Sequence, residues 1–506
     1  MKTKLVALLL VVFGMNMQAQ NDSINNILTK AKQGDAVAQN EVGMWYYTGK
    51  NNVKQDYKVA LQWWAHAAQQ KNVAAIGNMA LCYQYGRGIE KDSLMALQLY
   101  MRSIEAGNKA LLKERMAYAE KGDVYNNVLM ALCFQKGAGV EKNVVKAANY
   151  FKTAAGKGSA DAQRELALLL EVKIPQQAAL LYKKAAEQGD VVSLYRYGRL
   201  LLSGKGVEQN KQQAVSYWLK AAEQGYAQAQ CDLGNLYYQG TEVAKDAQQA
   251  AKWFTLSALQ GFAHAEWNLA VCFMRGEGVE RNFDQAIYWF GEAVADGYAK
   301  NFQTLCKDAE KGWKGQLFGT YLQGMAYYAG TNRNFEKAVE SFKQCDKKGI
   351  AEAQTMEALC YANKEWEKGN LKKGVKMLMK ASETLSNAAY YLGLLYEVGR
   401  GVEKDMDKAV ALFKQAASGG NALAQSYLGN LYYEGKGVTQ DYGLAVNYFR
   451  MVDEQGRLSA VACANYAACL ENGLGGLAVD KKKARALQKK DKKNNMAALL
   501  KLVPLQ

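Results

Sequence analysis

The sequence predicts an all-α fold in which a pair of antiparallel helices recurs every 36 residues. Three observations predict it: glycines return at a fixed spacing, each interval holds two apolar patterns of helical period, and Asp or Asn recurs where the second helix should begin. The glycines 36 apart are Gly189, Gly225, Gly261 and Gly297, and again Gly420 and Gly456. About twelve such units would form an α-solenoid, in which each unit buries its apolar face on its neighbours.

The six residues LGNLYY stand at 233–238 and return at 428–433. A catalytic motif is normally needed once, so the repetition indicates recurring structure. In the unit that ends at Gly261, the first apolar pattern is Ala229, Leu233, Leu236 and Tyr237, and the second is Ala250, Trp253, Phe254, Ser257 and Ala258. Both follow the period of an amphipathic helix.

The start of each second helix is marked by an Asp or Asn four residues before an alanine. Such side chains accept hydrogen bonds from the free N–H groups of a first helical turn. The column is Asp56, Asp92, Asn143, Asn210, Asp246, Asn282, Asn334, Asp405, Asp441 and Asp480. The closing glycine supplies the left-handed residue that ends the helix.

Between the two helices lies a loop of the type G-x-G-V, such as GKGV at 435–438. A nucleotide-binding loop follows a strand and carries further glycines or Gly-Lys-Ser/Thr. Here the loop follows a helix and recurs in most units, so the sequence favours a turn.

With stretches such as AQCDLGNLYYQG and AVSYWLKAAEQG, the chain resembles the Sel-one-like repeat family from about residue 31 to about 490. This family is a longer relative of the tetratricopeptide repeat. The resemblance implies a right-handed superhelix of helix pairs that acts as an adaptor for proteins or peptides. The family has no defining set of catalytic residues, so the resemblance implies no active site.

Departures from the period predict irregular places. Fifteen or sixteen extra residues near 108–122 and 298–312 indicate added helical segments. In another unit EVKIPQQAAL at 171–180 replaces the missing G-x-G-V loop, and Pro175 suits the first turn of a helix. No linker is visible, so residues 21–506 are expected to form one continuous array. Its last helix should begin at about residue 480 as a polar end cap.

Residues 1–20 have the pattern of a secretory signal peptide: Lys2 and Lys4, an apolar run from Leu5 to Phe13, and the small Ala19. The run is too short to cross a bilayer, and no later stretch is long enough. We therefore expect an exported protein, periplasmic or secreted, without a transmembrane segment in the mature chain. Export also argues against nucleic acid as a partner.

The nine cysteines include Cys82, Cys133, Cys272 and Cys469, which occupy the slot of the core residue Leu431. Buried thiols are therefore expected. Disulfides stay an alternative in an exported chain, above all for Cys463 with Cys469.

The sequence contains two histidines, His66 and His264, so a His-based triad or a His-rich metal site is excluded. We expect no enzyme, no catalytic residue, no cofactor and no metal. Two columns of aromatic residues, represented by Phe254 and Tyr237, are expected in the core rather than in a ligand site. A carboxylate pair with catalytic function stays an alternative, although an open, wet groove is a poor place to raise a carboxyl pKa.

The net charge is +16, and the basic excess gathers near the end of the chain. The candidate binding residues are Lys481, Lys482, Lys483, Arg485, Lys489, Lys490, Lys492 and Lys493. They predict either a polar cap or docking to an acidic envelope surface, such as anionic lipid or an acidic polymer. The favoured function is a scaffold that binds protein or peptide through polar groups on the first helices of successive units.

Overall fold

The computed structural model describes residues 23–51, 53–310, 316–330, 333–363 and 365–488. Helix contacts separate the chain into two compact units, Met1–Tyr217 and Trp218–Gln506, which divide within α12. The proposed signal peptide lies outside the described residues. No β-strand occurs in the described ranges, so the all-α prediction is confirmed.

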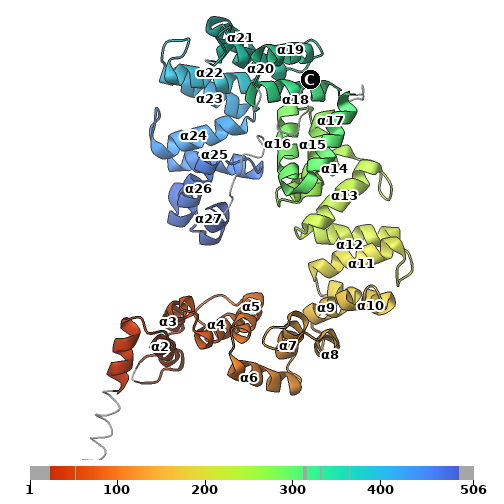
Figure 1. Ribbon diagram of the computed structural model, residues 1–506, viewed down its shortest axis with the longest axis vertical. Coiled ribbons are helices and arrows are strands. Elements are labelled where there is room, and N and C mark those ends of the chain that lie inside the picture. Colours follow the sequence, from red (N-terminus) through yellow and green to blue (C-terminus); the bar gives the residue numbers. More distant parts are fainter. Residues whose placement is uncertain (1–22, 52, 311–315, 331–332, 364, 489–506) are drawn as a thin grey trace, which may run out of the picture. The chain divides into compact units, whose positions relative to one another are not determined.

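In the first unit, helical residues 23–32 precede the following helices: α2 (Ala36–Thr48), α3 (Tyr57–Gln69), α4 (Val73–Tyr85), α5 (Ser93–Glu105), α6 (Lys109–Glu120), α7 (Val124–Lys136), α8 (Val144–Gly156), α9 (Ala160–Leu170), α10 (Pro175–Glu187), α11 (Val191–Ser203) and α12 (Lys211–Glu223). Within this unit α2 packs on α3, α4 on α5, α7 on α8 and α9 on α10 (Figure 1).

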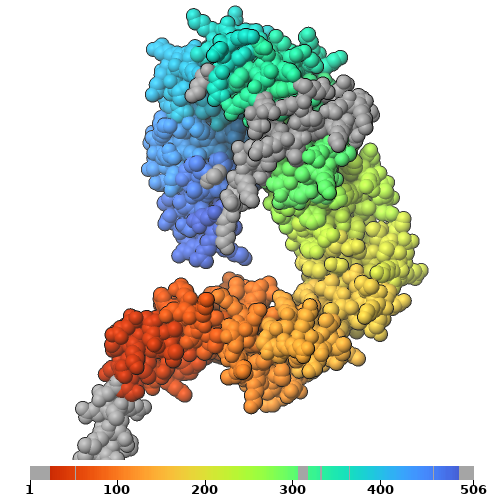
Figure 2. Space-filling view, viewed as in Figure 1, coloured from red at the N-terminus to blue at the C-terminus, as the bar shows by residue number. Residues whose placement is uncertain are grey.

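The second unit continues with α13 (Ala227–Gln239), α14 (Ala247–Ala258), α15 (Ala263–Arg275), α16 (Phe283–Ala293), the π-helix η1 (Val294–Tyr298), α17 (Ala299–Glu310), α18 (Gln316–Ala329), α19 (Phe335–Asp346), α20 (Glu352–Ala362), α21 (Leu371–Ser382), α22 (Ser386–Val398), α23 (Met406–Ser418), α24 (Ala422–Glu434), α25 (Tyr442–Glu454), α26 (Ala460–Asn472), the short 3₁₀ turn η2 (Leu474–Gly476) and α27 (Lys481–Gln488). Figure 2 shows the same succession from green to blue on the surface of this unit.

The Asp and Asn column lies where the sequence analysis places it. Every member caps a second helix; Asp441, for example, accepts a hydrogen bond from Leu444 N at 2.9 Å. The other nine side chains likewise accept from an N–H of the first turn. The cap signal thus marks the start of these ten second helices, whereas α10 begins at Pro175 without a side-chain cap.

The glycine of LGNLYY has a packing function. The ring of Phe449 on α25 lies against Gly429 on α24, so that a Cβ on Gly429 would be 2.5 Å from the ring. Gly234 and Phe254 repeat this contact at the same distance. Because Phe254 and Phe449 are fully buried, the motif recurs where a second-helix ring packs on the backbone of its own first helix.

We expect Gly429→Ala to lower the free energy of unfolding by about 1–3 kcal/mol, because the methyl group overpacks the ring of Phe449. Denaturant unfolding of the variant measures the loss. In Gly429→Ala with Phe449→Leu, the smaller side chain should recover part of it relative to Phe449→Leu alone. If the loss in the double variant instead equals the sum of the losses in the two single variants, the contact with Phe449 is not the reason for the glycine.

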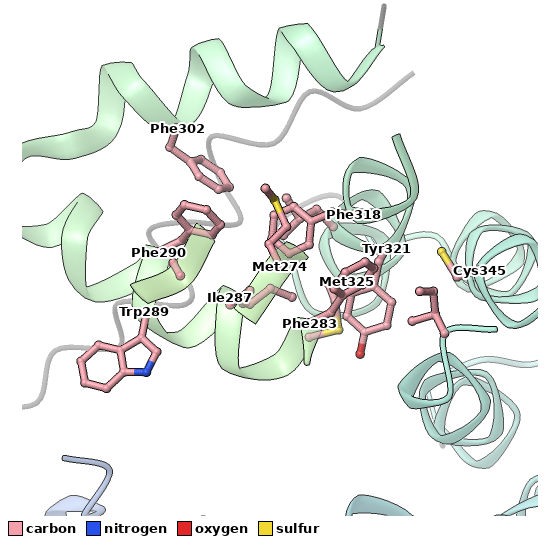
Figure 3. Packing of buried hydrophobic residues seen from close by; sticks show 14 of the residues in the cluster. Met274, Phe283, Ile287, Trp289, Phe290, Phe302, Phe318, Tyr321, Met325 and Cys345 are labelled. Carbon is pink, nitrogen blue, oxygen red and sulfur yellow. The ribbon is translucent and has the colours of Figure 1, made fainter. Parts of the chain in front are cut away.

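Added helices occupy the two long intervals: α6 lies in the first and α17 in the second. Phe302 of α17 is fully buried and faces Phe290 of α16, with ring centroids 5.7 Å apart (Figure 3). Phe318 of α18 also packs on Phe290, at 5.6 Å. The added helix α17 therefore contributes to the core of the second unit.

Eight of the described cysteines are buried: Cys82, Cys133, Cys231, Cys272, Cys345, Cys360, Cys463 and Cys469. Burial raises the pKa of Cys133 and Cys272 to about 12. The expectation of buried thiols is confirmed for these eight residues, including Cys463 and Cys469.

Candidate binding pocket in the second unit

Part of the basic cluster from the sequence analysis lies on α27. Lys481, Lys482 and Arg485 are exposed there, while Ala484 and Leu487 are buried. Lys483 instead forms an ion pair with Asp453, Nζ to Oδ2 2.9 Å. Lys489, Lys490, Lys492 and Lys493 lie outside the described residues. The described part of the cluster thus combines an apolar face that packs on the array with three exposed cations.

A pocket of about 300 Å³ lies elsewhere, inside the second unit. Four successive first helices, α18, α20, α22 and the start of α24, contribute to its wall, together with α16 and the turn before α26. The first helices are where the sequence analysis expects recognition by polar groups. The contributions of α16 and of the turn at Arg457 were not predicted.

Asp284 of α16 is the centre of a hydrogen-bond chain that crosses the pocket. Its Oδ1 accepts from the Tyr321 hydroxyl of α18 at 2.7 Å, and its Oδ2 accepts from Asn387 Nδ2 of α22. Asn387 Oδ1 accepts in turn from Asn421 Nδ2 at 2.5 Å. Asn421 also caps α24 through Ala424 N. Four helices are therefore tied together by side chains from positions as far apart as 284 and 421.

A second set of contacts joins α16 to the turn before α26. The Tyr288 hydroxyl donates to the carbonyl of Gly456 at 2.9 Å, across 168 residues of sequence. The Arg457 guanidinium lies over the Tyr288 ring, 4.7 Å from its centroid. Gly456 has φ +68°, and a Cβ there would be 2.5 Å from Leu259. These contacts hold Arg457 at the pocket wall.

Burial controls the electrostatics of the pocket. It raises the pKa of Asp284, while the hydrogen bond from Tyr321, the charge of Arg457 and the hydrogen bond from Asn387 act in the opposite direction. Burial also raises the pKa of Glu352, whose Oε1 accepts from Phe283 N at 3.3 Å. Burial lowers the pKa of Arg457, yet a guanidinium stays protonated at neutral pH.

This geometry corrects the expectation of a groove that is open and wet throughout. In the second unit, contacts between α16 and the turn at Gly456 narrow the inner face to a pocket in which carboxyl pKa values rise. Asp284 and Glu352 are the carboxyls that a catalytic alternative would use. Both accept hydrogen bonds that fix the architecture, so the arrangement favours binding over proton transfer.

In the ranges that the structure describes, no three or more His, Cys, Asp or Glu side chains lie together in a cluster that could bind a metal ion. Among those ranges, no helix is both long and apolar enough for a membrane span.

Sequence reasoning missed Asp284 because its local pattern is ordinary. It stands two residues after a helix cap, as the exposed Asp407 does in a later repeat. Arg457 did carry a signal, since it directly follows a closing glycine, where Asp35, Asp190 and Asn421 cap helices in other repeats. A cation at a position that holds a helix-capping Asp or Asn in other repeats departs from the repeat pattern, and this difference is visible in the sequence.

Comparison with protein families supports the repeat assignment. The model described as Sel1 repeat matches residues 36–72, 73–108, 127–159, 160–190, 191–226, 227–262, 263–298, 386–421, 422–451 and 460–489. The matched ranges make up more than half of the chain. No curated protein matches the sequence.

Similar solved structures include a protective antigen of uropathogenic Escherichia coli that displays an SLR fold. It is 25% identical, the match covers 95% of this chain and 93% of the antigen, and the TM-score is 0.40. A Sel1 repeat protein from Oxalobacter formigenes is 24% identical over 51% of this chain and 99% of its own, with a TM-score of 0.37. An immunity protein from Pseudomonas aeruginosa is 18% identical over 39% and 81%, with a TM-score of 0.27.

Proposed function

Because the chain belongs to the Sel1 repeat family, whose members generally act as protein–protein interaction scaffolds, we propose that it is an exported scaffold that binds a peptide segment of another protein in the pocket of the second unit. The observation that carries the proposal is the chain of hydrogen bonds through Asp284, Asn387 and Asn421, because it aligns polar groups of separate repeats along one wall. Binding on this view needs no covalent chemistry.

Site-specific photo-crosslinking tests the proposed binding site. Leu423 lines the pocket and is 45% exposed, while Met451 of the second helix α25 is 49% exposed and does not line it. A photoreactive residue at position 423, but not at position 451, should crosslink one defined protein from the native envelope fraction. Equal crosslinking at the two positions, or none at position 423, would contradict binding in this pocket.

Export is supported by the pattern of Lys2, Lys4 and the apolar run that ends at Phe13. Mass spectrometry of the mature protein from the native host should find an N-terminus after Ala19 or Gln20. A mature protein that retains Met1 in the cytoplasm would contradict export.

Docking of the basic end to an acidic surface stays a second candidate, favoured by the exposure of Lys481, Lys482 and Arg485. Changing these three residues to Gln should abolish binding to anionic lipid vesicles on this view and leave stability almost unchanged. Lys483→Gln is the matched control. It removes the partner of Asp453, and we expect a loss of unfolding free energy of up to about 1 kcal/mol.

Salt separates the two candidates. Binding through exposed lysines weakens steeply as ionic strength rises, since charges beyond roughly 10 Å are screened at about 0.1 M salt. Vesicle binding that is unchanged between low and high salt, or in the triple variant, would contradict docking through α27. A third candidate, catalysis by a carboxylate pair, predicts turnover in a substrate screen that Asp284→Asn removes.

A further inference from the structure

Arg457 is a half-buried cation that forms no ion pair at salt-bridge distance, although the charge of Asp284 acts on it from across the pocket. Among the described residues it forms no ion pair and no side-chain hydrogen bond, and its guanidinium lies over the face of the Tyr288 ring. Two other partly buried arginines are paired: Arg164 Nη1 lies 2.6 Å from Asp190 Oδ2, and Arg196 Nη1 lies 3.3 Å from Glu171 Oε2. A guanidinium presents a planar fork of donors that matches a carboxylate. At Arg457 that fork is unused.

The turn that carries Arg457 is fixed before any ligand arrives. Tyr288 binds the carbonyl of the preceding Gly456, and its ring supports the guanidinium from one side. Both contacts reduce the conformational entropy that Arg457 would lose on binding. The side chain is therefore preorganised at the pocket wall.

Thr355 of α20 provides a second and independent observation. Its side chain is 1% exposed and it lines the same pocket. Its Oγ1 has no hydrogen-bond partner within the described residues. A buried hydroxyl without a partner is costly and is normally satisfied, so an oxygen of a ligand is a natural acceptor for it.

Two donors of the pocket, on Arg457 and Thr355, have no hydrogen-bond acceptor within the described residues, whereas both of its carboxyls already accept. Asp284 already accepts from Tyr321 and Asn387, and Glu352 accepts from Phe283 N. The Arg457 fork and the Thr355 hydroxyl are unused. The matching ligand group is an anionic acceptor. A carboxylate fits better than a phosphate, because Asp284 and Glu352 line the same pocket and would repel a dianion more strongly.

The size of the pocket limits the ligand to a small group. A volume of about 300 Å³ is at the lower end of the range for ligand pockets, roughly 300–1,000 Å³. Met325 and Met356 supply apolar lining, which adapts to varied side chains. One or two residues of an extended peptide fit these features.

We propose that the pocket binds a carboxylate of a partner peptide, with Arg457 as its counter-ion and Thr355 as an additional donor. This inference rests on the proposed scaffold function, whose pocket it uses. The carboxylate comes from either an acidic side chain or a free C-terminus, and the two sources share the same chemistry.

Titration of the full chain with four small probes tests the inference. The probes are N-acetyl-Glu-amide and N-acetyl-Ala-Ala, which carry side-chain and terminal carboxylates, and their neutral counterparts N-acetyl-Gln-amide and N-acetyl-Ala-Ala-amide. Ligand-observed NMR should show at least tenfold weaker binding of the neutral member of one pair. The pair that discriminates identifies the source of the carboxylate. Equal binding within both pairs, or no binding of any probe, would overturn the inference.

Two variants test the assigned residues. Arg457→Gln should abolish the preference for the carboxylate probe, whereas the isosteric Thr355→Val should weaken that probe about threefold to tenfold and leave the neutral probes unchanged. Retained preference in Arg457→Gln would overturn the role of the guanidinium. Should Arg457→Gln fail to fold, Arg457→Lys keeps the charge and removes the fork, and an unchanged affinity in it would overturn bidentate binding.

The outcome is separable from that of the photo-crosslinking experiment. If a crosslinked partner binds Arg457→Gln as well as it binds the parent protein, the scaffold function stands and the carboxylate inference fails. If the probes bind through Arg457 but no protein crosslinks at position 423, the carboxylate site stands and the scaffold function fails.

Discussion

Glu266→Gln is expected to stabilise the protein, by about 5 kcal/mol at most, when unfolding is measured above pH 8. Glu266 on α15 is 3% exposed, and its Oε2 has no hydrogen-bond partner in the described part of the chain. Burial raises its pKa to about 8, and the charges of Asp296 and Glu292 act in the same direction. One pKa unit corresponds to about 1.4 kcal/mol.

The neighbouring repeats explain why glutamine suits this position. Gln230, 36 residues earlier, donates to Ala222 O at 3.0 Å and accepts from Gln260 Nε2 at 2.8 Å. Gln425 repeats both bonds with Ala417 and Gln455. In the repeat of Glu266, the position equivalent to Gln260 holds Asp296. Two carboxyls thus replace a pair of amides.

The direction of the pH dependence follows from proton binding. With a pKa of about 8 in the folded state and an ordinary value of 4.5, folded Glu266 holds a proton between these pH values that the unfolded chain has lost. Stability therefore falls as pH rises from about 4.5 to about 8. Below pH 4.5 the carboxyl is protonated in both states, so this destabilisation disappears.

Chemical unfolding at pH 5 and pH 8.5 measures the difference between Glu266→Gln and the parent protein. The gain should be small at pH 5 and largest at pH 8.5. Gln230→Glu is the reciprocal control, since it places a carboxyl in the same slot one repeat earlier and should introduce a similar loss of stability at high pH. A gain from Glu266→Gln that is equal at both pH values would contradict the buried carboxyl as its cause.

The repeat was predictable from sequence because every unit encodes it locally. A cap such as Asp441 and the alanine four residues later define one helix start with no information from distant residues. The same holds for the ring of Phe449 and the glycine of its own first helix. Because the same cap and the same glycine–ring pair recur along the chain, each copy strengthens the prediction made from the others.

The pocket was not predictable in the same way. Asp284 meets Asn387 only because several helix pairs between them curve in one direction, and that curvature accumulates from small rotations at each interface. The exposed Asp407 has the same local pattern as Asp284 and no such partner in the described residues. Sequence position in a repeat therefore predicts a residue's helix and face, whereas its distant neighbours follow from the geometry of the whole unit.

The second glycine of the G-x-G-V loop lets the loop approach the backbone of the preceding repeat closely. Gly278→Ala is therefore expected to lower the free energy of unfolding by more than about 3 kcal/mol. Gly278 has φ +76°, where any other residue costs roughly 1–2 kcal/mol. In addition, a Cβ would overlap the carbonyl oxygen of Ala247, the first residue of α14 in the preceding repeat. Backbone cannot rotate away as a flexible side chain does.

The same contact recurs in other repeats, since a Cβ on Gly206 would overlap Pro175 at the start of α10, and one on Gly475 would overlap Tyr442 at the start of α25. Gly261 is the matched control for Gly278. Its φ of +77° is almost identical, but nothing lies within 4 Å of a Cβ there. Gly261→Ala should therefore show the conformational cost alone, about 1–2 kcal/mol. Equal losses in the two variants, measured by denaturant unfolding, would show that left-handed backbone, and not the close approach to α14, is the reason for the second glycine.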